Sequence, residues 1–171
     1  VSGESLARCG PGDIKAKPII TELMGRQVKF ADGSVEEADV IVYATGYKMR
    51  FPFLSEADAP VRDNHLPLFK RMMQPEPRLH SLWFMGLAQS LPTLVNLAEQ
   101  QSKLLAAWLE GSYALPAPEE MRAIIGADEK LHRGHYYASS RHTMQVDFDV
   151  YVRDLAKELH AGTRRPQRRA A

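Results

Sequence analysis

Residues 35–54 read Val-Glu-Glu-Ala-Asp-Val-Ile-Val-Tyr-Ala-Thr-Gly-Tyr-Lys-Met-Arg-Phe-Pro-Phe-Leu. Inside this stretch, Val40–Ala44 is an unbroken apolar run that is rich in β-branched residues. Such a short run, bounded by turn residues, is typical of a strand buried on both faces of a parallel α/β sheet. The run stops at Thr45-Gly46, and ligands of open α/β sheets bind at the carboxyl ends of strands. Gly46 therefore lies where a cofactor is expected, although the pattern taken alone favours a glycine that only ends a strand.

A second short apolar segment, Leu82–Met85, repeats this arrangement because it ends at Gly86. We expect both segments to be buried strands. Their terminal glycines would then present backbone at the ligand edge of one sheet.

The stretch before Val35 has the pattern of a small antiparallel meander. Ile19–Leu23 and Val28–Phe30 have the composition of strands, with a turn at residues 24–26 between them. A second turn, at residues 31–34, contains Asp-Gly, which is a favoured hairpin dipeptide. The sequence thus predicts a meander that leads into the buried run.

Three amphipathic helices are predicted in the second half of the chain. The first begins near Thr93 and ends near Glu110, with Gly111 suited to the position after its last residue. The second covers residues 119–131, and the third follows the N-cap candidate Asp147 and stops at Gly162. Apolar stripes on these helices are expected to pack on the sheet. The stripe of the first consists of Leu94, Val95, Leu97, Ala98, Gln101, Leu104, Leu105 and Trp108.

The remaining segments are predicted to be irregular. Residues 55–78 contain four prolines and have the pattern of a polar loop, in which Lys70 and Arg71 are expected to be solvated rather than catalytic. Residues 163–171 form an arginine-rich tail, which is expected to be disordered.

Composition narrows the classes of function. Apolar residues make up 44% of the 171 residues and charged residues 25%, as in ordinary soluble globular proteins. The formal net charge of +1 gives no electrostatic reason to expect nucleic acid, and no apolar stretch approaches the ~20 residues that span a bilayer. Cys9 is the single cysteine, which excludes an internal disulfide and fits a cytoplasmic location.

A metal site at the histidines of the C-terminal half was considered. His132 and His135 are three residues apart, and His142 follows. We expect no metal site, because Gly134 is predicted to break the helix there and no carboxylate or cysteine completes the set of ligands.

Two motifs carry a family resemblance. The string Val-Tyr-Ala-Thr-Gly-Tyr, followed by Phe-Pro-Phe-Leu, is similar to the "ATGY" segment of flavin-containing monooxygenases. A second string resembles the segment that follows the last strand of the FAD domain in that family. It comprises Gly86, Leu87, Gln89, Ser90, Leu91, Glu99, Gln101, Ser102 and Lys103.

The resemblance covers about Ile14 to Leu159 and implies an α/β fold. The chain would be the C-terminal part of a flavoprotein with two dinucleotide-binding domains, a small β-meander plus a parallel-sheet remnant and covering helices. Residues 1–47 would end the NADP-binding domain and supply the junction strand. Residues 48–162 would be the C-terminal part of the FAD-binding domain.

The resemblance also implies the chemistry. NADPH would reduce FAD, and the C4a-hydroperoxide formed with O2 would transfer oxygen to a soft nitrogen or sulfur nucleophile of a small-molecule substrate. Since the cofactor carries the chemistry, no catalytic side chain is assigned. Cofactor-binding roles are expected for Thr45, Gly46, Tyr47, Gly86, Gln89 and Thr93.

Neither dinucleotide-binding glycine fingerprint of the family occurs in the chain. The resemblance therefore implies that both fingerprints belong to an N-terminal part of the same protein, and that residues 1–171 alone bind neither FAD nor NADP tightly and have no turnover. Three alternatives stay open, namely a Baeyer–Villiger-type enzyme, another flavin and NADP oxidoreductase such as a disulfide reductase, and a free-standing interaction module.

Overall fold

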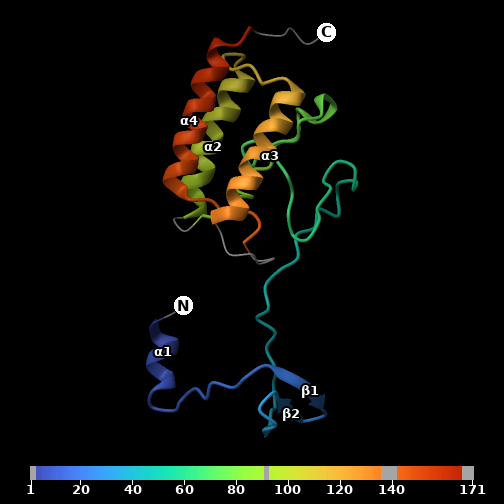
Figure 1. Ribbon diagram of the computed structural model, residues 1–171, viewed down its shortest axis with the longest axis vertical. Helices are drawn as coiled ribbons and strands as arrows, with labels where there is room; N and C mark the ends of the chain where they lie inside the picture. Colours follow the sequence, from blue (N-terminus) through green and yellow to red (C-terminus); the bar gives the residue numbers. More distant parts are fainter. Residues whose placement is uncertain (1–2, 91–92, 136–141, 167–171) are drawn as a thin grey trace. The chain divides into compact units, whose positions relative to one another are not determined.

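The chain forms two units, Val1–Thr45 and Gly46–Ala171, in a computed structural model that describes residues 3–90, 93–135 and 142–166. The first unit contains helix α1 (Gly3–Cys9) and strands β1 (Ile20–Met24), β2 (Gln27–Phe30) and β3 (Val35–Glu37). The second contains the 3-10 helix η1 (Pro77–Leu79) and helices α2 (Leu94–Leu109), α3 (Pro118–His135) and α4 (Phe148–Arg164) (Figure 1). Among the described helices, none combines the length and the apolarity that a bilayer crossing requires.

The three strands pair in chain order as an antiparallel sheet. Met24 pairs with Gln27 across a two-residue turn, whose first residue, Gly25, has a φ of +62°. Gly33, in the second turn, has a φ of +82°. Both turns place glycine in the left-handed region, where the backbone of a residue with a Cβ has a higher conformational energy. The predicted meander is therefore confirmed.

The predicted buried strands are wrong for the described chain. Neither Val40–Ala44 nor Leu82–Met85 is a strand, and Val40 and Val42 are 78% and 82% exposed. A strand that is buried on both faces needs a hydrogen-bonded neighbour on each side. No other strand pairs with either segment in the described residues, so the predicted parallel-sheet remnant is not found there.

The centre of the second unit is an irregular segment rather than a sheet. Every residue from Leu68 to Pro75 is buried, although loops normally run over the surface. Internal hydrogen bonds satisfy much of its backbone, because the Phe69 N–H donates to the Met73 carbonyl at 2.8 Å and the Met72 N–H donates to the Phe69 carbonyl at 3.0 Å. The prediction of a polar, solvated loop is wrong here, and Lys70 and Arg71 are only 5% and 8% exposed.

The central segment divides the core between the helices. Met72 packs with residues of α2 and α4, including Leu97 and Leu155. Its neighbour Met73 packs with Met121 and Ile125 of α3. Two adjacent methionines thus join the α2–α4 pair to α3, and the three helices lie side by side in Figure 1.

Side-chain caps fix where two of the helices begin. The Thr93 hydroxyl accepts a hydrogen bond from the Asn96 N–H at 3.5 Å, and the Asp147 carboxylate accepts one from the Val150 N–H at 3.0 Å. Both N-termini agree with the sequence prediction. The stripe of α2 is narrower than predicted, since Leu94 and Val95 are 56% and 74% exposed.

Two glycines that were predicted to end helices lie inside them. Gly134 is part of α3, so the predicted break there is wrong. Gly162 is buried within α4, which continues to Arg164. Thr163 and Arg164, which belong to the tail predicted to be disordered, are therefore helical, and residues 167–171 lie outside the described residues.

A buried polar cluster explains why glycine is needed at position 162. The Tyr113 hydroxyl donates to the Glu158 carboxylate at 2.8 Å, and the Arg165 guanidinium donates to the same oxygen at 2.5 Å. Burial first, and then the neighbouring Glu158 carboxylate, raise the pKa of the Tyr113 hydroxyl. The tyrosine ring reaches Glu158 by crossing the backbone of Gly162, where an added Cβ would lie 2.0 Å from ring carbons.

Replacing Gly162 with alanine is expected to lower the free energy of unfolding by about 1–3 kcal/mol, because the ring or the helix must shift. Urea denaturation of the two proteins measures the change. Gly126→Ala is the matched control, since Gly126 lies in α3 with nothing within 4 Å of its added Cβ. That control should stabilise the protein by up to about 1 kcal/mol, and equal effects of the two substitutions would contradict the packing argument.

Candidate functional site

The first group of predicted site residues lies where the two units meet in the sequence. Thr45 is the last residue of the first unit and Gly46 the first residue of the second. Gly46 has a φ of +92°, which agrees with a position that requires glycine. Tyr47 is 97% exposed, and its backbone carbonyl accepts a hydrogen bond from the Asn64 amide at 2.9 Å.

An aromatic contact joins the segment after Tyr47 to the segment before Gly86. The rings of Phe51 and Phe84 meet edge to face, with centroids 5.2 Å apart. Both pack in one apolar cluster around Leu66 and Leu68. The two sequence motifs therefore converge on the same cluster within the second unit.

The second group of predicted residues gathers at the N-terminus of α2. Gly86 has a φ of +69°, and a Cβ there would lie 3.2 Å from the Leu94 side chain. The Gln89 N–H donates to the Met144 carbonyl, and the Gln89 carbonyl accepts from the Val146 N–H, both at 2.8 Å. Gly86 and the Thr93 cap thus lie at the first turn of α2, whereas Gln89 is bonded to the segment that precedes α4.

A chain of hydrogen bonds runs from Gly86 into the core. The Gly86 N–H donates to the Gln101 side-chain oxygen at 2.7 Å, and the Gln101 amide nitrogen donates to the Tyr151 hydroxyl at 2.7 Å. That hydroxyl donates in turn to the backbone carbonyl of Lys70 at 2.6 Å. Gln101 is fully buried, and burial raises the pKa of the Tyr151 hydroxyl, which therefore stays protonated as a donor.

The sequence did not predict this series of hydrogen bonds. Gln101 was predicted to belong to the apolar stripe of α2, and no contact was predicted for Tyr151. A glutamine at a buried stripe position was the available signal, because a buried amide needs partners.

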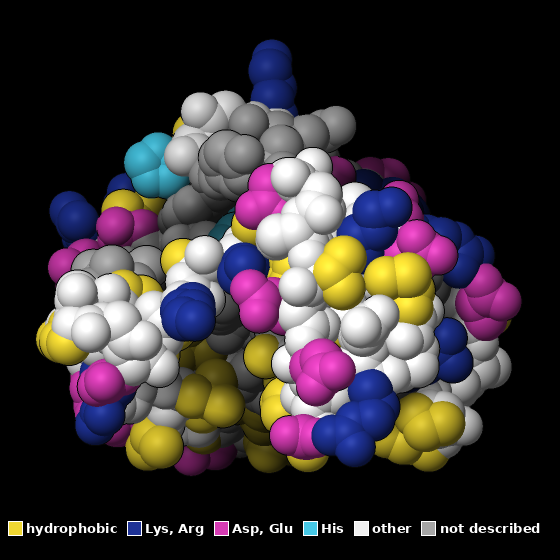
Figure 2. Space-filling model, turned by 90° about the horizontal axis from the view of Figure 1, so that it is seen from below, with side chains coloured by type: hydrophobic (Ala, Val, Ile, Leu, Met, Phe, Trp, Pro, Cys, Tyr) yellow, Lys and Arg dark blue, Asp and Glu magenta, His cyan; other side chains and the backbone are white. Residues whose placement is uncertain are grey.

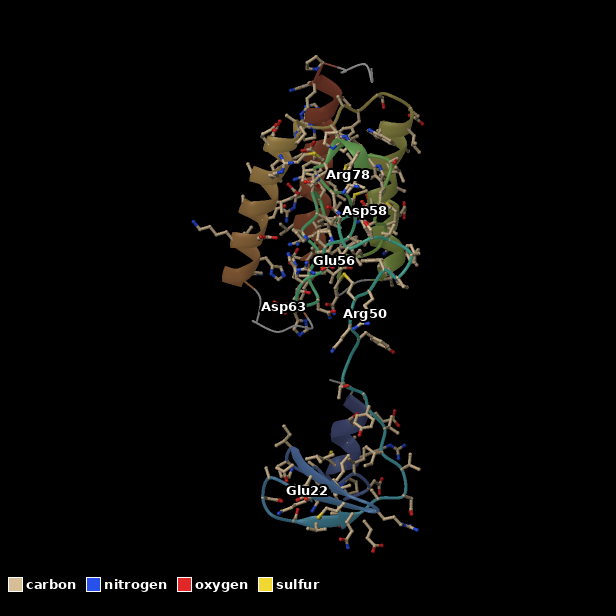
Figure 3. The ribbon with its side chains drawn as sticks, turned by 90° about the vertical axis from the view of Figure 1, so that its right-hand side faces the viewer. Glu22, Arg50, Glu56, Asp58, Asp63 and Arg78 are labelled. Atoms are coloured by element: carbon tan, nitrogen blue, oxygen red, sulfur yellow. The ribbon has the colours of Figure 1, made fainter. Side chains whose placement is uncertain are left out.

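An ion pair also links two segments of the second unit. Figure 3 shows Arg78 beside Asp58, and the two form an ion pair. The Ser55 hydroxyl donates to the Asp58 carboxylate at 2.7 Å, and this bond, followed by the bond from Arg78, holds the pKa of Asp58 below its usual value. Acidic and basic side chains are interspersed over the face shown in Figure 2.

The structure thus brings some of the predicted site residues together. Gly86 and Thr93 lie at the N-terminal end of α2, and Gln89 is bonded to the segment before α4. Gly46 and Tyr47 belong to the same unit and lead into the segment that packs beside Gly86. No group of three or more potential metal ligands is found in the parts of the chain that the structure describes.

Comparison with known proteins shows the family. Residues 4–166 match the model of flavin-binding monooxygenase-like proteins. The chain belongs to that family. The resemblance inferred from the sequence motifs is confirmed.

Two relatives from mammals show the same relationship. The chain is 34% identical to dimethylaniline monooxygenase [N-oxide-forming] 2 of Rattus norvegicus and 30% identical to flavin-containing monooxygenase 3 of Homo sapiens, over 151 residues in both cases. Each alignment covers 88% of this chain and 28% of the relative. The monooxygenase-like chain therefore spans little more than a quarter of the length of these relatives.

A solved structure supports the same assignment. S-allyl-L-cysteine S-oxygenase from Allium sativum matches 79% of the chain and 31% of its own, with a TM-score of 0.63 and 32% identity. The monooxygenase-like chain thus shares sequence and fold with a flavoenzyme family, in a mixed α and β structure with a small antiparallel sheet.

The hydrogen-bond chain through Tyr151 makes a testable prediction. Tyr151→Phe should reduce the free energy of unfolding by about 1–3 kcal/mol, because it leaves the Gln101 amide and the Lys70 carbonyl buried without their partner. Chemical denaturation followed by circular dichroism measures this change. Tyr47→Phe is the control, since its exposed side chain should tolerate the change to within about 0.5 kcal/mol. Equal stability of Tyr151→Phe and the unmodified chain would contradict the assigned network.

Proposed function

We propose that this chain acts as the C-terminal part of an FAD-dependent, NADPH-using monooxygenase that oxygenates soft nitrogen or sulfur nucleophiles. The observation that carries the proposal is the family match over residues 4–166. The names of two relatives point to the type of product, since one is described as N-oxide-forming and another as an S-oxygenase. Their activities belong to proteins more than three times as long as the region they share with this chain.

The local geometry is consistent with residues that contact a flavin or position the helix beside it. Gly46 offers backbone without a Cβ, and the Tyr47 side chain and the Gln89 side chain are exposed. Gly86 and Thr93 have a different role, because the Gly86 N–H is bonded to Gln101 and the Thr93 hydroxyl caps α2. We therefore assign cofactor contact to Gly46, Tyr47 and Gln89, and positioning of the α2 N-terminus to Gly86 and Thr93.

When bound, the flavin supplies the reaction with O2 and the oxygen transfer, after reduction by NADPH. This chain would contribute backbone and side-chain contacts that orient the ring system and exclude water. No described side chain is assigned as an acid, a base or a nucleophile. The glycine fingerprints that hold dinucleotide phosphates are absent from these 171 residues, so that part of cofactor binding is assigned to another part of the protein.

The first test compares residues 1–171 with the longest product of the reading frame that contains them. After gel filtration, the 171-residue chain should carry little FAD and should not oxidise NADPH. A longer product should carry FAD and consume O2 with NADPH in the presence of a tertiary amine or a thioether. Stoichiometric FAD on the 171-residue chain would contradict the assignment of dinucleotide binding to another part of the protein. A longer product without flavin would contradict the proposed function.

The second test places a β-branched residue at Gly46 in the flavin-loaded protein. Gly46→Val should lower the flavin content and NADPH oxidation, because valine is strained at a φ of +92° and its side chain would occupy space next to the cofactor. Gly12→Val is the matched control, since Gly12 has a φ of +90° and nothing within 4 Å of an added Cβ. If both variants retain the same flavin content, Gly46 has no special role beside the cofactor.

A further inference from the structure

A cavity of about 520 Å³ lies in the second unit, and its lining does not include Gly46, Tyr47 or Gln89, although Val146 in its wall is bonded to Gln89. It is bounded by α3, α4 and the turn that contains Lys70 and Arg71. Leu131 and Val150 contribute apolar walls. A volume of this size falls in the range of small-molecule sites in proteins, which is about 300–1,000 Å³.

Arg71 is the unusual residue of this cavity. Arg71 is one of the residues that line the cavity, and it is only 8% exposed. Within the described residues its guanidinium makes neither a hydrogen bond nor an ion pair, and only its backbone N–H is bonded, to the Leu68 carbonyl at 3.1 Å. A buried cation without a partner is costly, because burial removes its water without replacing the lost interactions.

The backbone at this point is also strained. Lys70 and Arg71 have φ values of +50° and +56°, a conformation that residues other than glycine rarely adopt. Two such residues in succession persist only where the surroundings hold them, and such strain gathers at binding sites. Here the surroundings are the Phe69–Met73 hydrogen bond and the Tyr151 hydroxyl on the Lys70 carbonyl.

The carboxylates around the cavity are largely committed elsewhere. Asp154 accepts a hydrogen bond from the Lys70 ammonium at 2.7 Å, and Asp147 caps α4. Burial is the largest influence on Asp128 and raises the pKa of its carboxyl, while the nearby Lys70 and Arg71 charges act in the opposite direction. Among the described residues, no carboxylate lies within ion-pair distance of the Arg71 guanidinium, and Asp128 interacts with that charge only at longer range.

We propose that this cavity binds a small organic carboxylate, held by the Arg71 guanidinium and packed against Leu131 and Val150. The planar guanidinium can donate two parallel hydrogen bonds to a carboxylate, which matches its charge and geometry. The apolar walls suit a short hydrocarbon portion attached to that carboxylate. The proposal stands whether or not the proposed oxygenation is correct, because the lining of the cavity includes none of the residues assigned to the flavin.

The test titrates the 171-residue chain with sodium butanoate at constant ionic strength and follows the side-chain N–H resonance of Arg71 by NMR. Butanamide, which has the same shape without the charge, and inorganic phosphate, which has charge without the hydrocarbon, are the comparison ligands. Saturable binding of butanoate is expected, with butanamide and phosphate each weaker by at least about tenfold, a factor equivalent to about 1.4 kcal/mol.

Two variants test the geometry in separate ways, with binding measured by calorimetry. Arg71→Gln removes the charge, and Val150→Trp fills the cavity from a position that is 54% exposed and so should not disturb folding. Both should weaken butanoate binding at least about tenfold, a factor equivalent to about 1.4 kcal/mol. Arg122→Gln is the control, because Arg122 carries the same charge on α3, does not line the cavity and should leave the affinity unchanged.

Three results would overturn the proposal. These are no saturable butanoate binding by the unmodified chain, equal binding of butanoate and either comparison ligand, and an unchanged butanoate affinity in Val150→Trp. The last result counts even if Arg71→Gln fails to fold.

Discussion

The hydroxyl of Tyr151 is the contact on which the second unit depends. It accepts a hydrogen bond from Gln101 on α2 and donates one to the carbonyl of Lys70, while its own backbone belongs to α4. Three segments that are far apart in the sequence are thereby joined at one buried atom. Polar groups at such a point stabilise the interior only when all of them are satisfied, which makes the arrangement specific as well as stable.

This contact accounts for the irregular core. A segment as buried as Leu68–Pro75 would normally be a strand or a helix, because those structures satisfy their own backbone. Here a side chain from α4 satisfies the carbonyl at the tightest point of the turn, so the segment can remain irregular and still be buried. Lys70 and Arg71, which have positive φ values, lie in this segment, and Arg71 lines the cavity.

The features that the sequence predicted well are those that depend on neighbouring residues. Thr93 and Asp147 begin helices because each caps a backbone N–H three residues further on. Gly25 and Gly33 make the hairpin turns because glycine tolerates a positive φ. The two glycine-containing motifs were enough to indicate the family.

The features that were predicted wrongly depend on residues far away in the sequence. Val40–Ala44 has the composition of a buried strand, but composition does not supply the strands that would pair with it. Lys70 and Arg71 carry charge and were therefore expected to be exposed to water. Their surroundings come instead from distant residues, since Lys70 pairs with Asp154 and the other residues that line the cavity lie more than 50 positions further along the sequence. Gly134 does not break α3, because one glycine costs a helix only about 1 kcal/mol.

The exposed run at residues 40–43 has a consequence for handling the chain. Val40, Val42 and Tyr43 are 74–82% exposed in an extended segment whose backbone pairs with no other strand in the described structure. Unpaired β-prone backbone of this kind is a template on which a second copy can add. We therefore expect the isolated polypeptide to self-associate as its concentration rises, and a polar substitution in this run to reduce that association.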